Sequence, residues 1–234
     1  MNIIKPQEFI HFIPKEYQRY AGIGPYLIPI FGKMYFERIR YILSKILKSA
    51  IKPFKVLDVG AGFGFFSVNF KLNFPKCNYY LLDLYSNELL DIVKSIMYNK
   101  LNLDFNYSFE SDIQNKTHFA DDSFDLTFAL DVLEHLNDPE LALTEILRIT
   151  KPNGYIFISV PTESNILKFF RMVYNKIIPI ETQPHWKGKI TSEKEFFKLL
   201  NSKKIKIVFK KKFPFNFLPK IFSYDIFYFI QKTG

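Results

Sequence analysis

The chain alternates between short apolar runs and segments with helical periodicity. Between residues 53 and 161 the apolar runs have the length of strands, and periodic segments separate them. Strands alternating with helices at this spacing predict a parallel sheet covered by helices. We expect strands at 56–59, 79–83, 105–109, 124–130 and 155–160, and helices at 65–72, 86–98 and 138–150.

The rhythm stops after Pro161 and resumes near the C-terminus. Ser192 and Glu195 form an S-x-x-E pattern, which is typical of a helix start, and two further strand patterns follow at 205–210 and 224–230. The predicted fold class is therefore α/β. We expect a Rossmann-like, doubly wound and mostly parallel seven-stranded sheet with helices on both faces.

Two segments fall outside this alternation. Residues 1–52 are expected to form a helical lead or cap, and residues 53–234 the main domain, with 161–190 inserted on the substrate side. Within the lead, 35–48 carries an apolar stripe at helical spacing, formed by Phe36, Ile39, Ile42, Leu43, Ile46 and Leu47. The stripe favours packing against the core, with a helix on a membrane surface as the alternative.

Composition narrows the class of protein. Hydrophobic residues make up 48% of the 234 residues, which is enough for a sizeable core. No apolar run approaches the roughly 18 residues that a membrane span needs, and the N-terminus lacks a signal-peptide pattern. Cys77 is the only cysteine, so an internal disulfide is excluded. A cytoplasmic location is the simplest expectation.

The basic charge has several readings. The formal charge of +9 fits compositional bias, nucleic acid, an anionic membrane or an acidic substrate. Six lysines gather near the C-terminus before a run of apolar residues: Lys203, Lys204, Lys206, Lys210, Lys211 and Lys212, then Phe213, Phe215, Phe217 and Leu218. They fit a solvated strand edge, because lysine commonly guards edges. Peripheral docking on an anionic membrane is the alternative.

A glycine-rich turn is the strongest chemical signal. The stretch 56–64 reads V-L-D-V-G-A-G-F-G, so a strand runs into a turn that brings bare backbone against a ligand. A dinucleotide fingerprint needs G-x-G-x-x-G, and its third glycine would fall on Phe65. Asp58 would also repel a pyrophosphate. The turn therefore favours a ligand that carries an amino group and no phosphate.

Two more carboxylates follow the next predicted strands. Asp83 ends the second strand, where a carboxylate accepts hydrogen bonds from ribose hydroxyls. Asp112 follows the third strand, where it can meet an adenine amino group. Together with Asp58, these residues describe a site for a nucleoside that bears an amino acid.

The region 53–161 resembles the class I S-adenosylmethionine-dependent methyltransferases. Asp58 and the three glycines match the first motif of that family, Asp83 its ribose-binding acid, and Asp112 with Ile113 its adenine-contacting pair. The stretches 130–136, 147–148, 151–154 and 158–161 resemble later segments of the family, except that Asn153 stands where glycine is usual. The resemblance implies S-adenosylmethionine as cofactor, bound by Asp58, Gly60, Ala61, Gly62, Gly64, Asp83, Leu84, Asp112, Ile113 and Leu130.

An acid–histidine cluster, Asp131, Glu134 and His135, follows the fourth predicted strand. A histidine titrates near neutral pH, so His135 is our candidate for the base that deprotonates an attacking hydroxyl, with Glu134 beside it. A purely structural pairing of the two is the alternative. Adjacent residues point into one pocket only from an irregular turn. The interval between the fourth predicted strand and the helix that starts at Asp138 permits such a turn.

A second local resemblance concerns the acceptor. The stretch 185–196 and the acid–histidine cluster resemble segments of ubiquinone-pathway O-methyltransferases, and the cluster also resembles the metal-binding set of small-RNA 2′-O-methyltransferases. His185 could therefore join Glu134 and His135 around the acceptor, either with a base or with a divalent cation. Asp131 stands where the metal-binding pattern has glutamate, so the prediction assigns no metal.

These observations predict an enzyme that methylates a hydroxyl of a small-molecule, lipid or glycan acceptor. A non-catalytic binding module with the same fold and an RNA 2′-O-methyltransferase are the alternatives, and a nucleic-acid partner is disfavoured.

Overall fold

The computed structural model describes residues 1–17, 29–49, 51–84, 87–103, 107–161, 193–201, 205–213 and 225–234. The chain divides into two compact units. The first holds the described residues up to Glu110, and the second holds those from Ser111 onward.

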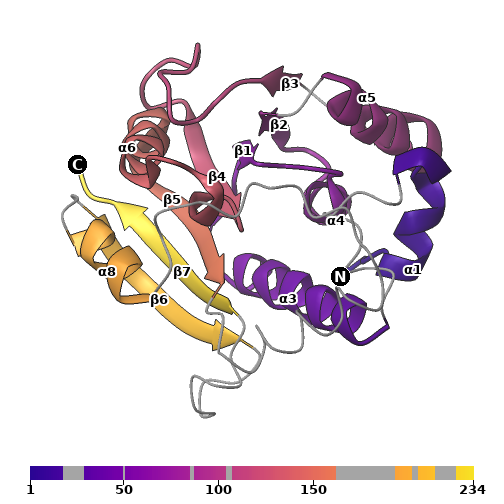
Figure 1. The fold of residues 1–234 in the computed structure, drawn as a ribbon, viewed down its shortest axis with the longest axis horizontal. Coiled ribbons are helices and arrows are strands. Elements are labelled where there is room, and N and C mark those ends of the chain that lie inside the picture. Colours follow the sequence, from indigo (N-terminus) through magenta and orange to yellow (C-terminus); the bar gives the residue numbers. More distant parts are fainter. Residues whose placement is uncertain are drawn as a thin grey trace. The chain divides into compact units, whose positions relative to one another are not determined.

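Three parallel strands form the sheet of the first unit. They are β1 (Lys55–Val59), β2 (Asn78–Asp83) and β3 (Tyr107–Glu110), in the order β3-β2-β1. Val59 pairs with Leu82, so Asp83 extends beyond the end of β1. Helix α4 (Phe65–Asn73) connects β1 to β2, and α5 (Asn87–Ser95) follows β2 (Figure 1). A π-helical turn, η3 (Ile96–Lys100), extends α5 beyond the end predicted for it.

The described residues of the N-terminal segment, 1–17 and 29–49, contain several helices. These are α1 (Pro6–Phe9), the short 3-10 helices η1 (Ile10–Phe12) and η2 (Lys15–Tyr17), and the long helix α3 (Pro29–Leu47). Four members of the apolar stripe of α3 are at most 3% exposed: Ile39, Ile42, Leu43 and Ile46. Leu47 is 43% exposed, so the buried stripe ends before it. These four residues therefore pack in the core and do not form a free surface that could face a membrane.

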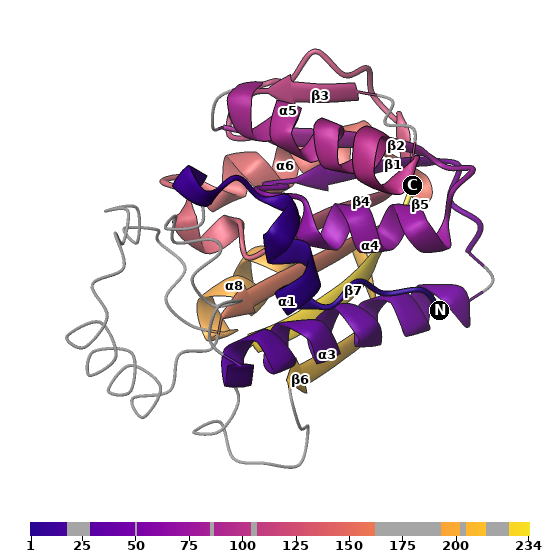
Figure 2. The same ribbon diagram turned by 90° about the vertical axis from the view of Figure 1, so that its right-hand side faces the viewer.

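The first residues of the chain run along α4 in the opposite direction. Asn2 exchanges hydrogen bonds with the Asn73 side chain at 3.0 and 2.6 Å, and Ile4 N donates to Asn69 Oδ1 at 2.7 Å. The ring of Phe9 lies 4.9 Å from that of Phe65, between centroids. The segment therefore reaches the beginning of α4, and Figure 2 shows α1 beside α3 and α4.

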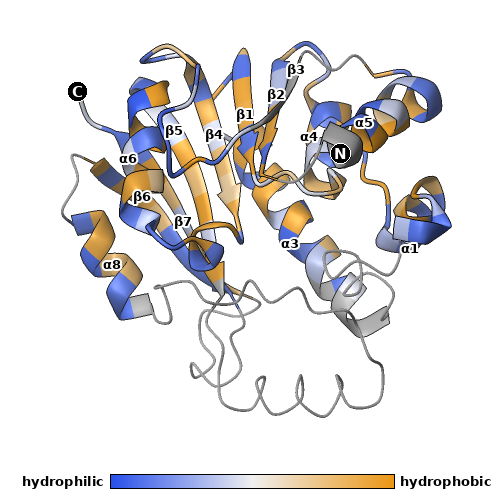
Figure 3. Cartoon of the chain, turned by 45° about the horizontal axis from the view of Figure 1, so that its top comes forward, coloured by the Kyte–Doolittle hydropathy of each residue, from blue (hydrophilic) through white to orange (hydrophobic). Residues whose placement is uncertain are grey.

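Four strands form the sheet of the second unit. Parallel strands β4 (Phe124–Leu130) and β5 (Thr150–Pro161) are followed by β7 (Asp225–Lys232), which is antiparallel to both β5 and β6 (Ile205–Phe213). The order is β4-β5-β7-β6, so the sheet is mixed. Helices α6 (Pro139–Ile149) and α8 (Glu193–Asn201) have one hydrophobic and one hydrophilic side (Figure 3).

Local signals placed α6 correctly and the start of β5 incorrectly. Asp138 caps α6, because its Oδ1 accepts a hydrogen bond from Leu141 N at 3.1 Å. The strand predicted at 155–160 begins earlier in the structure: β5 starts at Thr150 and contains an irregularity in its register with β4. Asn153 adopts a left-handed φ of 61°, which asparagine tolerates, so the bend is accommodated within the strand. A side chain on Gly154 would come within 2.8 Å of Lys151 O.

The α/β class with parallel and antiparallel strands agrees with the prediction. The predicted division at residue 52 and the insertion at 161–190 stay predictions, since 162–192 lie outside the described residues. Within the described ranges, no helix has both the length and the apolar character needed to cross a membrane.

Candidate functional site

The turn between β1 and α4 is built from three glycines with positive φ. Gly60, Gly62 and Gly64 have φ angles of 67°, 51° and 72°, in the region that disfavours side chains. Backbone hydrogen bonds, two to β2 and one within the turn, fix its conformation. Gly60 N and Ala61 N both donate to Leu82 O, at 2.7 and 3.3 Å, and Gly64 N donates to Ala61 O at 2.9 Å.

The surroundings of two of these glycines differ. A Cβ atom on Gly62 would meet nothing within 4 Å, so space is open above this residue. A Cβ atom on Gly64 would overlap the Val93 methyl groups of α5, so Gly64 allows that helix to pack closely. Gly62 thus faces room for a ligand, whereas Gly64 serves packing.

Asp83 holds the centre of the turn. Its Oδ2 accepts a hydrogen bond from Gly62 N at 2.7 Å, and the residue is 5% exposed at the end of β2. Leu84, the next residue, is 54% exposed. The structure thus places a buried carboxylate beside the open glycine, and an exposed apolar side chain follows it in the sequence. This combination suits the ribose and base of a nucleoside.

Asp58 is buried behind the same turn, at 3% exposure. Its Oδ2 accepts hydrogen bonds from the Ser67 hydroxyl of α4 and from the Tyr79 hydroxyl of β2, the latter at 3.2 Å. Burial raises the pKa of the Asp58 carboxyl to about 7, and the charge of Asp83 adds to the rise, while the bonds from Ser67 and Tyr79 oppose it. The two carboxylates create a negative potential, which favours a cationic ligand.

Asp112, in the second unit, lies in a loop fixed by Gln114. Asp112 Oδ1 accepts from Gln114 N at 2.9 Å, and its two oxygens accept from Gln114 Nε2 at 3.1 and 3.2 Å. Gln114 Oε1 accepts from Asp138 N at 2.7 Å, which ties the loop to the start of α6. Ile113 is buried at 3% exposure. The carboxylate predicted to meet adenine is therefore held in one orientation.

The end of β4 carries a second sharp turn. Leu130, predicted to contact the cofactor, is half-buried, and Asp131 follows it with a φ of 57°. The Ser159 hydroxyl of β5 accepts from Asp131 N at 3.0 Å and donates to Asp131 Oδ1 at 2.7 Å. This pair of bonds stabilises a conformation that is unfavourable for a residue with a Cβ atom.

The acid–histidine pair lies in the irregular turn that its chemistry requires. Glu134 and His135 belong to the 3-10 helix η4 (Leu133–His135), between β4 and α6. His135 Nε2 lies 3.8 Å from Glu134 Oε1; the Glu134 side chain is 6% exposed and that of His135 is 34% exposed. An accessible imidazole beside a buried carboxylate can take up a proton.

His185 lies outside the described residues, so its predicted approach to this pair stays a prediction. Over the described ranges, no group of three or more histidine, cysteine, aspartate or glutamate side chains is arranged to hold a metal ion.

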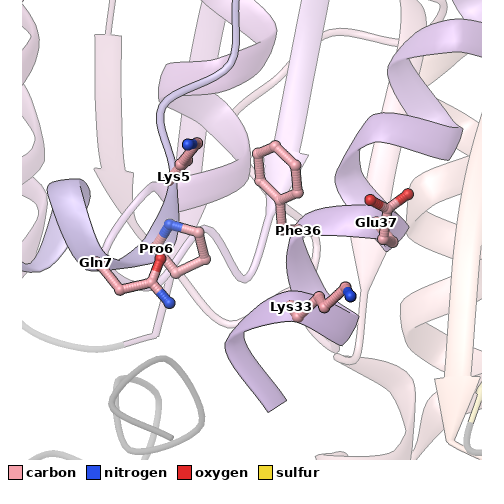
Figure 4. A pocket seen from close by; sticks show the side chains of 6 residues that line it. All are labelled: Lys5, Pro6, Gln7, Lys33, Phe36 and Glu37. Atoms are coloured by element: carbon pink, nitrogen blue, oxygen red, sulfur yellow. The ribbon is translucent and has the colours of Figure 1, made fainter. Parts of the chain in front are cut away.

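A pocket opens in the first unit between the N-terminal segment and α3. Its volume is about 370 Å³, and Figure 4 shows the side chains that line it: Lys5, Pro6, Gln7, Lys33, Phe36 and Glu37. None of these residues was among the predicted site residues.

Four other residues were missed: Ser67 and Tyr79, which hold Asp58, Gln114, which holds Asp112, and Ser159, which holds Asp131. Gln114 was accessible to sequence reasoning, because an aspartate commonly bonds to the backbone two residues later. The other three lie 9 to 28 positions from their partners, so no local pattern marks them.

Comparisons with known proteins identify a related family over this part of the chain. The profile of a family described as "Methyltransferase domain" matches residues 57–158, which span the glycine turn, Asp83, Asp112 and the acid–histidine pair.

Two curated relatives share a similar region. An uncharacterised methyltransferase of Schizosaccharomyces pombe is 36% identical over 118 residues, 47% of this chain and 41% of the relative. A mitochondrial ubiquinone biosynthesis O-methyltransferase of Dictyostelium discoideum is 27% identical over 175 residues, 68% of this chain and 53% of the relative. The matched part thus spans about half the length of these relatives.

The fold also matches solved structures. A SAM-dependent methyltransferase from Aquifex aeolicus superposes with a TM-score of 0.59 at 19% identity, over 97% of this chain and 98% of that one. This likeness confirms the Rossmann-like fold class.

Proposed function

We propose that this chain is a class I S-adenosylmethionine-dependent methyltransferase and that it methylates a hydroxyl group of a small-molecule, lipid or glycan acceptor. The Dictyostelium relative is named an O-methyltransferase, which supports oxygen as the methylated atom.

One observation carries the choice of cofactor. Four N–H groups of the glycine turn, those of Gly60, Ala61, Gly62 and Gly64, donate to acceptors within the protein. They are therefore not arranged as the cradle of N–H groups that binds a phosphate. Behind them lie the carboxylates of Asp58 and Asp83. This surface suits a ligand with cationic groups and no phosphate, as S-adenosylmethionine is.

We assign each cofactor residue a part. Asp83 accepts hydrogen bonds from the ribose hydroxyls while it holds Gly62, and Leu84 lies against the base. Asp58 stabilises the cationic methionine part through its negative charge and fixes the turn through Ser67 and Tyr79. Asp112, oriented by Gln114, accepts from the adenine amino group, with Ile113 and Leu130 as apolar neighbours.

The bound cofactor supplies a methyl group already activated by a sulfonium centre. The protein therefore needs to place the acceptor oxygen in line and to exclude competing water. His135 takes the proton of the hydroxyl as its oxygen bonds to the methyl carbon, and Glu134 stabilises the imidazolium that forms. The sulfur keeps the electron pair of the broken bond.

The lysines of β6 are assigned to protection of the sheet edge. Lys206 and Lys210 are exposed on this terminal strand, and the Lys210 ammonium lies 5.7 and 5.4 Å from the ring centres of Phe197 and Tyr228. Cosedimentation at low salt tests this assignment. Equal, negligible binding to anionic and neutral vesicles is expected, and stronger binding to anionic vesicles would support the membrane alternative.

Cofactor binding is the first test of the proposed enzyme. Calorimetry should detect S-adenosylmethionine and its demethylated product, and not NAD. Asp83→Ala should weaken both by about one to two decades, because charge-assisted hydrogen bonds of about 1.5–3 kcal/mol are lost. Asp91→Ala is the matched control, since this aspartate is exposed and pairs with Lys94. Absence of binding, or unchanged affinity in Asp83→Ala, contradicts the proposal.

Turnover is the second test. Incubating the enzyme with a small-molecule extract and methyl-labelled cofactor should yield a labelled product that mass spectrometry can identify. Cofactor binding without any labelled product would favour a non-catalytic module.

A further inference from the structure

The pocket lined by Lys5, Pro6, Gln7, Lys33, Phe36 and Glu37, here called the N-terminal pocket, has no part in the cofactor site described above. Figure 4 shows the Phe36 ring between the segment 5–7 on one side and the side chains of Lys33 and Glu37 on α3. Its volume of about 370 Å³ is suited to a small molecule.

The course of the N-terminal segment places this pocket close to the glycine turn. Ile4 bonds to Asn69 of α4, and Phe9 contacts Phe65, so Lys5–Gln7 lie alongside the first turns of that helix. Four helical residues correspond to about 6 Å along the axis. Phe65 directly follows Gly64. A molecule in the pocket is therefore within a small ligand's length of the turn that holds the methionine part.

The lining combines cations with apolar surface. Lys5 and Lys33 are exposed, and among the described residues no carboxylate forms an ion pair with either. Glu37 is the single acid of the lining, and its Oε1 accepts from Arg40 Nη1 at 3.1 Å, which offsets its charge. Pro6 is buried and Phe36 half-buried, so they form an apolar wall.

We propose that the N-terminal pocket holds the acid group and ring of the methyl acceptor, which makes the acceptor an aromatic hydroxy acid. Lys5 and Lys33 pair with the carboxylate, and Phe36 packs against the ring. The flexible side chains of Lys5 and Lys33 let their ammonium groups move over Phe36 when the acid binds. This inference rests on the proposed methyl transfer and adds the class of acceptor to it.

The methionine carboxylate of the cofactor has the same chemistry as the acid group of an acceptor. Substitution of the two lysines distinguishes a carboxylate of the acceptor from that of the cofactor. If the lysines hold the acceptor, their removal leaves cofactor affinity unchanged. If they hold the cofactor, its affinity falls and discrimination between acidic and neutral acceptors does not depend on them.

Binding of a matched pair of probes tests the inference. 4-Hydroxyphenylacetate and its neutral isostere 4-hydroxyphenylacetamide are titrated by NMR into the full chain saturated with S-adenosylhomocysteine. We expect the acid to bind at least fivefold more tightly than the amide. In Lys5→Gln/Lys33→Gln that preference should disappear. Lys45→Gln, which removes another exposed lysine of α3, should keep it.

Three outcomes would overturn the inference: no binding of the acid, equal binding of acid and amide to the wild type, or a preference that survives in the double variant. A fivefold or larger loss of S-adenosylmethionine affinity in the double variant would also overturn it, in favour of the cofactor carboxylate. Calorimetry of the wild type with the cofactor separates failure of this inference from failure of the proposed function. Cofactor binding without probe binding removes only this inference, whereas absence of cofactor binding removes the proposed function.

Discussion

The turn after β1 and the turn after β4 both reverse the chain sharply at the end of a parallel strand, and they do so by different means. The first uses glycines at φ angles of 51° to 72° and is held by backbone groups and Asp83. The second places a side chain at such an angle, on Asp131, and the Ser159 hydroxyl stabilises it.

The difference matches what each turn is proposed to do. A turn without side chains leaves space for a ligand to lie against the backbone, as the open surroundings of Gly62 show. A turn with side chains can present reactive groups, here Glu134 and His135 in η4. Cofactor binding thus favours a turn without side chains, whereas catalysis favours a turn that carries them.

Filling the glycine turn should have the largest effect. Gly64→Ala adds a methyl group that overlaps the Val93 methyls at a φ of 72°. We expect a loss of about 2–4 kcal/mol in the free energy of unfolding, measured with denaturant. Gly62→Ala is the control: its Cβ is unobstructed, so stability should fall by only about 1–2 kcal/mol while cofactor affinity drops.

A second substitution isolates the cause of the Gly64→Ala defect. Gly64→Ala/Val93→Ala should be less destabilised than the sum of the two single variants, because the overlapping methyl groups are gone. Strict additivity would show that the Val93 contact does not limit position 64.

Removing the imidazole from the second turn should slow chemistry without weakening cofactor binding. His135→Ala should lower the rate of methyl transfer about 100-fold, as expected when a general base is lost. His118→Ala removes an exposed histidine of the same unit and should leave the rate within twofold.

The same assay decides between the alternatives for the acid–histidine pair. If His135 acts as a base without a metal, a chelator should leave the rate of methyl transfer by the wild type unchanged. Loss of activity on chelation, with rescue by a divalent ion, would point to a metal. A rate in His135→Ala within twofold of wild type would leave the pair a structural role.

The buried acid behind the first turn should make binding pH-dependent. Because the pKa of Asp58 is raised to about 7, the carboxyl is mostly protonated at pH 6 and mostly ionised at pH 8. Affinity for the cationic cofactor should therefore rise about tenfold between these values, and Asp58→Asn should flatten the profile. Calorimetry at both pH values checks this, and an unchanged slope in Asp58→Asn would contradict it.

Cofactor affinity should rise with pH, whereas the free energy of unfolding should fall. The unfolded carboxyl ionises near its ordinary pKa of 3.8, while the folded one keeps its proton up to about pH 7. The folded state therefore binds more protons in this window, and the free energy of unfolding should fall as pH rises from about 4 to about 7. The difference between wild type and Asp58→Asn, measured with denaturant, isolates this contribution.

Loosening the second turn should have the smallest effect. Ser159→Ala removes the group that bonds both to the backbone and to the carboxylate of Asp131, and should cost about 1–1.5 kcal/mol in unfolding free energy. Asp131→Gly removes the strain that Ser159 offsets, so the double variant should be more stable than the sum predicts. Simple additivity would show that Ser159 does not stabilise the left-handed conformation.

The sequence alone determined the elements and the chemical types at their ends. Alternating apolar runs located the strands, and Asp138 with Pro139 located the start of α6, because these signals act within a few residues. The three glycines and the gap before Asp138 likewise predicted two sharp turns. Local patterns placed the start of β5 too late, because Thr150 already pairs with Phe124 of β4, ahead of the register shift that precedes the pairing of Tyr155 with Leu126.

How these parts act together depends on contacts between residues that are distant in the sequence. The tertiary structure placed Asp58 between Ser67 and Tyr79, paired Asp131 with Ser159, set Gly64 against Val93, and inserted β7 between β5 and β6. It also carried the first residues along α4 to form the N-terminal pocket. The physical reason is distance along the chain. These contacts join residues whose separation exceeds any local hydrogen-bonding pattern, so strand register and helix packing set them, and backbone propensity does not.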